Sequence, residues 1–236
     1  MEKLRTRLML DFLRERGHCS MAELMRRFKV SSATVHRDVE ELTRRDAVTR
    51  VRGGLVFNET ESSRPDAAGY QNRVVANRTA KIALAKKALA LISEGDIIFL
   101  DSSTTVYELA MLLRNANFTH LSIVTNSVSI MQNFRKFPPN YVLIGLGGNY
   151  DPQLNSILGA AALEQLSRLN LTKAFVSCFG LDQRTATTNH ERQAEMLRNV
   201  LDLAERRYLL VDKSKLNRTG LYRLSARGAF NAILTN

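Results

Sequence analysis

Five short apolar runs alternate with helical segments over the last two thirds of this chain. The runs lie at residues 97–100, 121–124, 141–144, 174–176 and 208–211. The helical segments lie near residues 80–92, 105–114, 127–135, 160–168 and 190–205. A strand that is apolar along its whole length is buried on both faces, and a helix between successive strands lets them run parallel. The sequence therefore predicts an α/β domain with a mainly parallel sheet covered by helices on both faces.

Polar residues directly follow four of these predicted strands, in the segments 101–105, 125–127, 147–149 and 212–215. Ligands of open α/β sheets bind at the carboxyl ends of the strands. Hydroxyls and backbone N–H groups there suit a phosphate group, Asp101 suits sugar hydroxyls, and Lys81 or Lys215 supplies counter-charge. A hydroxyl before a helix is more often only an N-cap, but four such segments favour a site for a small phosphorylated ligand.

Residues 30–42 predict a short helix with one apolar and one polar face. Val35 and Val39 recur one helical turn apart, and Ser31 is a good N-cap. Val30 is placed to pack against Val35 as a hydrophobic staple. Polar side chains lie on the rest of the helix: Ser32, Thr34, His36 and Arg37. A sharply defined helix start with a polar face suits an approach to a phosphate chain.

Two further helices are predicted before this segment. Residues 4–13 have an apolar helical face that stops before Gly17, a plausible C-terminal cap. Ser20 and Glu23 form a capping box for the second helix. Three helices with a very short turn before the last match a helix-turn-helix, in which the later helix enters the major groove of DNA.

A β-hairpin is predicted after the third helix. Apolar residues between 48 and 56 flank Arg52-Gly53-Gly54, a glycine turn with a basic tip. In a winged helix-turn-helix, Arg50 and Arg52 would contact phosphates or reach a minor groove. The alternative is a solvated hairpin whose arginines bind nothing specific.

Residues 58–72 predict a linker, because they are polar, contain Pro65 and Gly69, and lack either hydrophobic period. The linker separates a domain at 1–57 from a domain at 73–236. The 34 basic and 23 acidic residues give a net charge of +11, which favours an anionic partner such as nucleic acid or a phosphorylated metabolite. Basic charge is denser in the first domain, which has 13 Lys and Arg against 8 Asp and Glu.

Several classes of protein and site are not supported by the sequence. No apolar run is long enough to span a bilayer and the start lacks a signal peptide's apolar segment, so we expect a cytoplasmic protein. Cys19 and Cys178 are far apart and outside any metal-type spacing, which favours buried or inert thiols. The histidines are isolated and no catalytic triad spacing is present. We therefore predict no catalytic residues, no cofactor and no metal site.

Taken in order, these motifs resemble those of the DeoR family of bacterial sugar-metabolism repressors along essentially the whole chain. The resemblance is carried by Val30-Ser31 through Asp38, Arg52-Gly53-Gly54, Arg73, Asn77, Lys81-Ile82-Ala83, Asp101 to Thr105, Thr125-Asn126-Ser127, Gly147-Gly148, Leu158-Gly159 and Asp212 to Lys215. It implies a winged helix-turn-helix DNA-binding domain joined to an α/β sensor domain akin to ribose-5-phosphate isomerase. It also implies a homo-oligomer, a dimer or tetramer, in which a phosphorylated sugar or related metabolite binds the sensor domain and changes the affinity for operator DNA, usually relieving repression.

The resemblance and the motifs together give two sets of candidate residues. The candidates for DNA binding are Ser31, Ser32, Thr34, His36, Arg37, Arg50 and Arg52. The candidates for effector binding are Lys81, Asp101, Ser102, Ser103, Thr104, Thr105, Asn126, Gly147, Gly148 and Lys215. The chain departs from the family's usual pattern in four places: Ser103 stands where Gly is usual, His36 where Arg is common, and Gln193 and Leu197 where an acid and a lysine are usual.

The leading prediction is a transcriptional repressor of a carbohydrate-utilisation operon. One alternative is a working sugar-phosphate isomerase with a DNA-binding appendage, using Asp101 or Glu191 as base, although no second acid/base partner is evident. Another alternative is a sensor that has lost its effector, given Gln193 and Leu197, and regulates constitutively.

Overall fold

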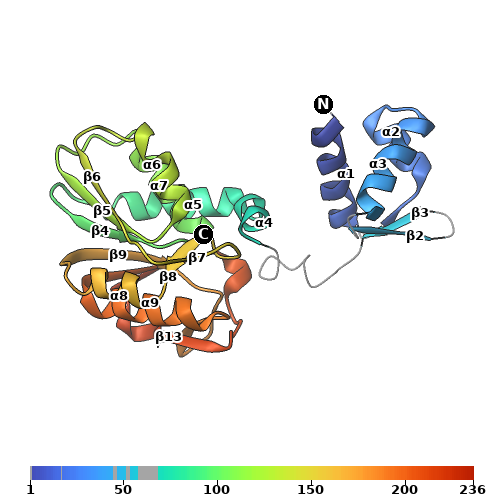
Figure 1. Ribbon diagram of the computed structural model, residues 1–236. Coiled ribbons are helices and arrows are strands. Elements are labelled where there is room, and N and C mark those ends of the chain that lie inside the picture. The colour runs from blue at the N-terminus through green and yellow to red at the C-terminus, as the bar shows by residue number, and fades with distance from the viewer. Residues whose placement is uncertain (1, 17, 45–46, 52–53, 58–68) are drawn as a thin grey trace. The chain divides into compact units, whose positions relative to one another are not determined.

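A computed structural model describes residues 2–16, 18–44, 47–51, 54–57 and 69–236 (Figure 1). The chain divides into two compact units, residues 1–68 and residues 69–236. Each unit has a hydrophobic core of its own. None of the helices within the described ranges is long and apolar enough to cross a membrane.

The first unit, residues 1–68, packs helices against a small antiparallel sheet. Its elements are α1 (Glu2–Arg16), β1 (His18–Cys19), α2 (Met21–Phe28), α3 (Ser32–Arg44), β2 (Val48–Val51) and β3 (Gly54–Phe57). The predicted hairpin is confirmed, since Val48 pairs with Phe57 and Val51 with Gly54. The sheet order β1-β3-β2 adds a strand that was not predicted, because two residues are too few to show a period.

Local hydrogen bonds define where α2 and α3 begin. Ser20 Oγ accepts from Glu23 N at 3.2 Å and Ser20 N donates to Glu23 Oε2 at 2.8 Å, so the predicted capping box is present. Lys29 ends α2 in the left-handed conformation, with φ of 51°. Ser31 Oγ then accepts from Thr34 N at 3.3 Å at the start of α3. The turn between the two helices is therefore only a few residues long, as a helix-turn-helix requires.

The second unit, residues 69–236, is built on a six-stranded parallel sheet in the order β14-β12-β9-β4-β5-β6. Its strands are β4 (Ile97–Leu100), β5 (Leu121–Thr125), β6 (Tyr141–Gly145), β9 (Leu171–Ser177), β12 (Ala204–Val211) and β14 (Ala232–Thr235). Each of the five predicted apolar runs lies within one of these strands. The predicted parallel α/β architecture is confirmed.

Helices cover both faces of this sheet (Figure 1). One face carries α5 (Arg78–Leu89), α6 (Thr104–Leu113) and α7 (Val128–Asn133), and the other carries α8 (Ala160–Leu166) and α9 (Glu191–Leu203). Neighbouring residues of β4 show the alternation, since Ile98 lies in one core and Phe99 in the other. Both faces of the strands are thus buried, which explains their apolar sequences.

The remaining elements of the second unit were not predicted. They are α4 (Tyr70–Val75), the hairpin β7 (Asn149–Asp151) and β8 (Ser156–Leu158), the antiparallel strands β10 (Gly180–Leu181), β11 (Thr185–Thr188) and β13 (Tyr222–Ala226), and the single turns η2 (Phe134–Lys136), η3 (Lys213–Lys215) and η4 (Arg227–Ala229). Residues 70–72, which the sequence assigned to the linker, form the first turn of α4 because the Tyr70 side chain is buried.

The strand order reverses between β4 and β9. From β4 the chain moves outward through β5 and β6, and it then returns to the other side of β4 to add β9, β12 and β14. The carboxyl ends of two strands whose connections leave in opposite directions form a crevice, which is where ligands of open α/β sheets bind. A ligand-binding site is therefore expected at the residues that follow β4 and at the end of β9.

Candidate functional site

Asp101 and Ser177 meet across this crevice. Asp101 follows β4, and its carboxylate accepts from Ser103 N and Ser177 N, both at 2.8 Å. The side chain is buried, and burial raises its pKa, while the Ser103 hydroxyl and the two backbone amides oppose that rise. The carboxylate thus joins the turns after two neighbouring strands. Its oxygens retain further lone pairs for a hydroxyl donor.

Two lysines lie at the same edge of the sheet. Lys215 Nζ lies 3.1 Å from Ser177 Oγ and 4.0 Å from an oxygen of Asp212. Lys81 on α5 is buried, and its ammonium donates to the backbone oxygen of Arg73. Burial first, and then the charge of Lys215, lower the pKa of Lys81 to about 8. Two ammonium groups that repel each other in a partly dry site favour an anionic ligand.

The hydroxyl-rich segment after Asp101 begins α6. Ser103 is its N-cap, because Ser103 Oγ accepts from Val106 N at 3.2 Å. Ser102, Thr104 and Thr105 are buried, and Thr105 Oγ1 has no hydrogen-bond partner. After β5, Asn126 donates to Ser156 Oγ at 2.9 Å while its Oδ1 has no partner. Thr105 and Asn126 therefore each keep a buried polar atom that no described residue satisfies.

Gly147 and Gly148 lie on the far side of β5, beyond β6. Gly147 N donates to Gln165 Oε1 at 3.0 Å. Gly148 has φ of 145°, and a Cβ there would lie 2.8 Å from the oxygen of Leu158. Their nearest neighbours thus belong to β8 and α8 rather than to the group formed by Lys81, Asp101 and Lys215. Gly148 allows the close approach of β8, and Gly147 contacts α8.

The two substituted positions on α9 do not add charge to the site. Gln193 accepts from Thr188 Oγ1 at 2.6 Å. Leu197 is buried in the core shared by α9 and the sheet. Glu191, the alternative base, is exposed at the start of α9. The charged groups of the crevice therefore come from α5 and from the turns after β4 and β12.

Sequence reasoning missed two contributors to this site. Ser177 was overlooked although it directly follows the apolar run 174–176, so the rule that found Asp101 would also have found it. Arg73 contributes its carbonyl oxygen, and a backbone atom leaves no trace in a sequence.

In the first unit, α3 buries one face and exposes the other. Val35 and Val39 are fully buried and Leu42 nearly so. Ser31, Ser32, His36 and Arg37 are exposed, and Thr34 is half-buried with its hydroxyl 3.0 Å from that of Ser31. The structure therefore places these five residues, one just before α3 and four on it, outside the buried face formed by Val35, Val39 and Leu42. This is the geometry of a helix that reads a major groove.

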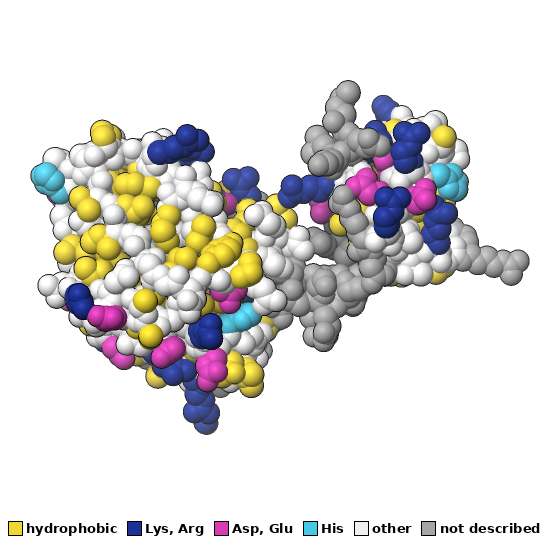
Figure 2. All heavy atoms as spheres, in the orientation of Figure 1, with side chains coloured by type: hydrophobic (Ala, Val, Ile, Leu, Met, Phe, Trp, Pro, Cys, Tyr) yellow, Lys and Arg dark blue, Asp and Glu magenta, His cyan; other side chains and the backbone are white. Residues whose placement is uncertain are grey.

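Basic side chains flank this helix. Arg50 on β2 is exposed and its Nη2 lies 3.5 Å from the backbone oxygen of His36, so the hairpin adjoins α3. Arg52 lies outside the described residues. Arg26, Arg27 and Lys29, which were not predicted as DNA-binding, are exposed at the end of α2 and in the turn before α3. Figure 2 shows several Lys and Arg side chains on the visible face of this unit.

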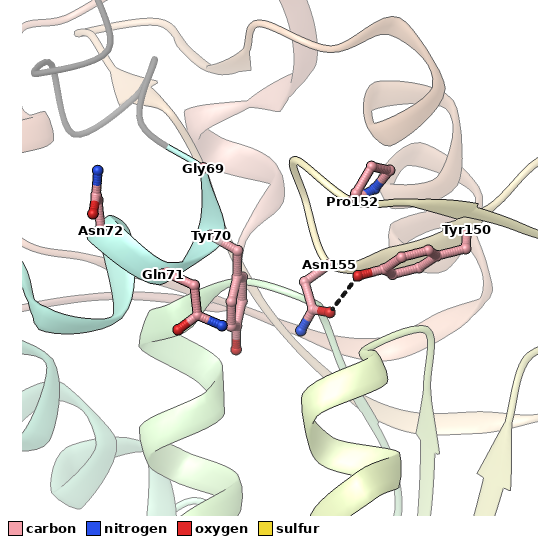
Figure 3. Close-up of a pocket in the computed structure, with 7 residues that line it drawn as sticks. All are labelled: Gly69, Tyr70, Gln71, Asn72, Tyr150, Pro152 and Asn155. Carbon is pink, nitrogen blue, oxygen red and sulfur yellow. Dashed lines mark hydrogen bonds between the residues drawn. The ribbon is translucent and has the colours of Figure 1, made fainter. Parts of the chain in front are cut away.

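A cavity of about 300 Å³ lies between α4 and the β7–β8 hairpin (Figure 3). It is lined by Gly69, Tyr70, Gln71, Asn72, Tyr150, Pro152 and Asn155. Tyr150 donates to Asn155 Oδ1 at 3.1 Å, and Asn155 Nδ2 contacts Ser129 Oγ at 2.5 Å. The hairpin is thereby tied to α7, which begins after β5, so the cavity lies at the carboxyl edge of the sheet.

The described part of the chain shows neither a metal-binding cluster nor an accessible thiol. No three His, Cys, Asp or Glu side chains there come together as a metal site would require. Cys19 and Cys178 are free and buried, as predicted from their spacing. Burial raises the pKa of each thiol to about 11.

Both units of the chain match models of known protein families. Residues 5–61 match the DeoR-like helix-turn-helix domain and residues 76–236 match the DeoR C terminal sensor domain. An L-fucose operon activator from Haemophilus influenzae is 31% identical over 98% of this chain and 91% of that protein. The HTH-type transcriptional repressor GlcR of Bacillus subtilis is 25% identical over 96% of this chain and 85% of that protein.

Among solved structures, ribose 5-phosphate isomerase A from Methanocaldococcus jannaschii is similar to part of the second unit. The TM-score is 0.43 with 18% identity, over 60% of this chain and 55% of that protein. So distant a likeness says nothing about activity.

Proposed function

Because the chain belongs to the DeoR family of transcriptional regulators, we propose that it is a cytoplasmic homo-oligomer that represses a carbohydrate-utilisation operon. The first unit binds operator DNA. The second unit holds the oligomer together and binds a phosphorylated sugar or related metabolite, which lowers the affinity for DNA. The observation that carries this proposal is the pair Lys81 and Lys215 beside Asp101, at the point where the strand order of the sheet reverses.

The chemistry of the crevice supports an organic phosphate. Lys81 and Lys215 supply charge for a phosphate group, and Ser177 already orients the Lys215 ammonium. Asp101 and the unpartnered atoms of Thr105 and Asn126 supply acceptors and a donor for hydroxyl groups. These groups remain although α9 contributes Gln193 and Leu197, which favours a working sensor over one that has lost its effector.

The same contacts weigh against an isomerase. Both oxygens of Asp101 already accept backbone N–H groups, and its partners hold it in the turn. Glu191 is exposed on α9. General acid/base catalysis needs two placed groups on either side of the substrate, and we assign Asp101 to ligand binding.

DNA binding is tested by titrating the protein into DNA fragments from the neighbourhood of its own gene in a gel-shift assay. We expect Arg37→Ala to weaken specific binding at least about fivefold, because an arginine that contacts a base edge contributes about 1–3 kcal/mol. The control is Lys86→Ala, which removes an exposed positive charge from α5. Equal affinity of Arg37→Ala and the wild type would contradict the assignment of α3 as the reading helix.

Ligand binding is tested by thermal unfolding with a panel of sugar phosphates, because a ligand bound only by the folded state raises apparent stability. We expect Lys215→Met to abolish the stabilisation. The control, Lys173→Met, removes a lysine that pairs with Asp96 at 2.6 Å at the opposite, amino-terminal edge of the same sheet. Stabilisation that survives Lys215→Met would place the ligand elsewhere.

A further inference from the structure

Helix α4 is the first element of the second unit, which begins at Gly69, directly after the first unit in the sequence. It has six residues, and its N-cap residue, Gly69, provides no side-chain hydrogen bond. A helix this short has no stability of its own in water. Its folded state therefore depends on contacts with the rest of the unit.

Side-chain hydrogen bonds attach α4 and its junction with α5 to neighbouring segments. Lys81 Nζ donates to the Arg73 oxygen, and Arg73 Nη2 donates to the Gln153 oxygen at 3.0 Å. Asn77, between the two helices, donates to Ser214 Oγ at 3.2 Å. Two of these bonds lead to the ligand crevice, because Lys81 lies in it and Ser214 precedes Lys215.

One buried ring and an open pocket adjoin α4. Tyr70 is buried, and the Arg73 guanidinium lies over its ring, 6.0 Å from the centroid. The Tyr70 hydroxyl makes no hydrogen bond of acceptable geometry, although Ser129 and Asn155 lie close to it. The cavity of about 300 Å³ separates α4 from the β7–β8 hairpin (Figure 3). Burial of Tyr70 and the hydrogen bond from Lys81 therefore act together in holding α4 in place.

Lys81 can hold a ligand and α4 at the same time. An ammonium group has three donors, and the Arg73 oxygen accepts one of them. Without a ligand, burial and Lys215 disfavour the charge on Lys81. An anion between the two lysines removes their repulsion and keeps Lys81 charged. A charged donor makes a shorter and stronger hydrogen bond to the carbonyl than a neutral one.

We propose that α4 is a strap fastened by the ligand: an organic phosphate held by Lys81 and Lys215 strengthens the Lys81–Arg73 hydrogen bond and orders α4. Occupancy of the crevice is thereby reported to the segment that leads to the DNA-binding unit. The strap rests on the proposed function, since its ligand is the effector, and it adds the part of the sensor that responds.

The strap is tested first without any ligand, by hydrogen–deuterium exchange of the full chain. We expect Lys81→Met to speed exchange in residues 70–76 about tenfold, since α4 loses one charge-assisted hydrogen bond. Arg73→Met, which removes the bond to Gln153 and the guanidinium over the Tyr70 ring but keeps the Arg73 backbone oxygen, should speed it about threefold. Lys173→Met is the control and should leave exchange in residues 70–76 unchanged. Wild-type exchange in both Lys81→Met and Arg73→Met would overturn the strap.

The second arm adds inorganic phosphate as the probe. At pH 9, where Lys81 of the free protein is mostly neutral, we expect saturating phosphate to slow exchange in residues 70–76 about fivefold in the wild type and to have no effect on these residues in Lys81→Met. At pH 7, where Lys81 is already mostly charged, the effect in the wild type should be smaller. Phosphate that raises the unfolding temperature of the wild type without slowing this exchange would overturn the strap and leave the anion site standing. Phosphate that does neither would overturn the anion site and, with it, fastening by a ligand.

Discussion

Arg5 on α1 holds the buried carboxylate of Asp38 on α3 through two hydrogen bonds, Nε to Oδ2 at 2.6 Å and Nη2 to Oδ1 at 2.9 Å. Asp38 follows Arg37 directly on the helix that we propose reads DNA. The pair therefore fixes the rotation of α3 about its axis, and with it the direction in which the exposed side chains point. A bidentate arrangement holds the geometry more firmly than a single contact.

Asp38→Asn should loosen this helix. The substitution leaves the Arg5 guanidinium without its carboxylate, and because Arg5 is about a quarter exposed we expect the cost to be about 2 kcal/mol. Exchange of α3 amides should accelerate about 30-fold. The control is Arg16→Ala, which breaks an exposed pair with Glu23 at 3.1 Å and should change exchange less than about twofold. Equal effects of the two substitutions would contradict a fixing role for Arg5 and Asp38.

Asp101→Asn tests the carboxylate that joins β4 and β9. The amide of Asn points a donor at one of the two backbone N–H groups that Asp101 now accepts, so a buried donor loses its partner. We expect a cost of about 2 kcal/mol, or a fall of about 5 °C in the unfolding temperature. Stabilisation by phosphate should fall as well, because the turn that positions Ser177 and Lys215 is disturbed.

Asp182→Asn is the matched control. Asp182 also accepts two backbone N–H groups, from Arg184 and Thr185 at 2.7 Å, but in a turn between β10 and β11. We expect a smaller fall in the unfolding temperature and unchanged stabilisation by phosphate. Loss of phosphate binding in both variants would show that the effect of Asp101→Asn is not specific to the crevice.

Phosphate binding should weaken as pH rises through about 8. The pKa of Lys81 is lowered to about 8 by burial and by Lys215, while Asp212 and Glu108 oppose the shift and Arg73 adds to it. Lys81 is therefore mostly charged at pH 7 and mostly neutral at pH 9 in the free protein. Since the anion needs the charged form, we expect the affinity for inorganic phosphate to fall about tenfold over this interval.

Calorimetric titration of Lys81→Arg provides the reference, because arginine stays charged throughout this range. The ionisation of phosphate affects both proteins equally, so the ratio of their affinities isolates the titration of Lys81. A ratio that stays constant between pH 7 and pH 9 would contradict the assignment of Lys81 to the anion site.

The sheet could be read from the sequence because its strands are buried on both faces. Residues 97–100 are apolar throughout and form β4 with the predicted bounds. The hairpin formed by β7 and β8 escaped prediction because its strands have three residues each and mix polar with apolar side chains. Helix α4 was not predicted for a similar reason. Its one buried side chain, Tyr70, lies in a polar stretch, and a single apolar residue does not show a helical period.

The candidate site was partly predictable for a related reason. Asp101 and Lys215 were found because they follow apolar runs, and parallel strands bring their carboxyl ends to one edge. The bond between Lys81 and the Arg73 oxygen was not, because any residue supplies a carbonyl. The adjacency of β4 and β9, which sets Asp101 against Ser177, depends on strand order, and strand order is decided by packing between distant segments.

Neither cysteine should react in the folded protein. Cys19 and Cys178 are buried, and burial raises the pKa of each thiol to about 11, so almost no thiolate is present at pH 8. A chromogenic disulfide reagent should therefore modify both thiols within minutes in guanidinium chloride and neither over the same period in native buffer. Cys19→Ala and Cys178→Ala identify the source of any signal. Rapid native modification that disappears only in Cys178→Ala would show that the end of β9 opens to solvent, contrary to the closed packing around Ser177.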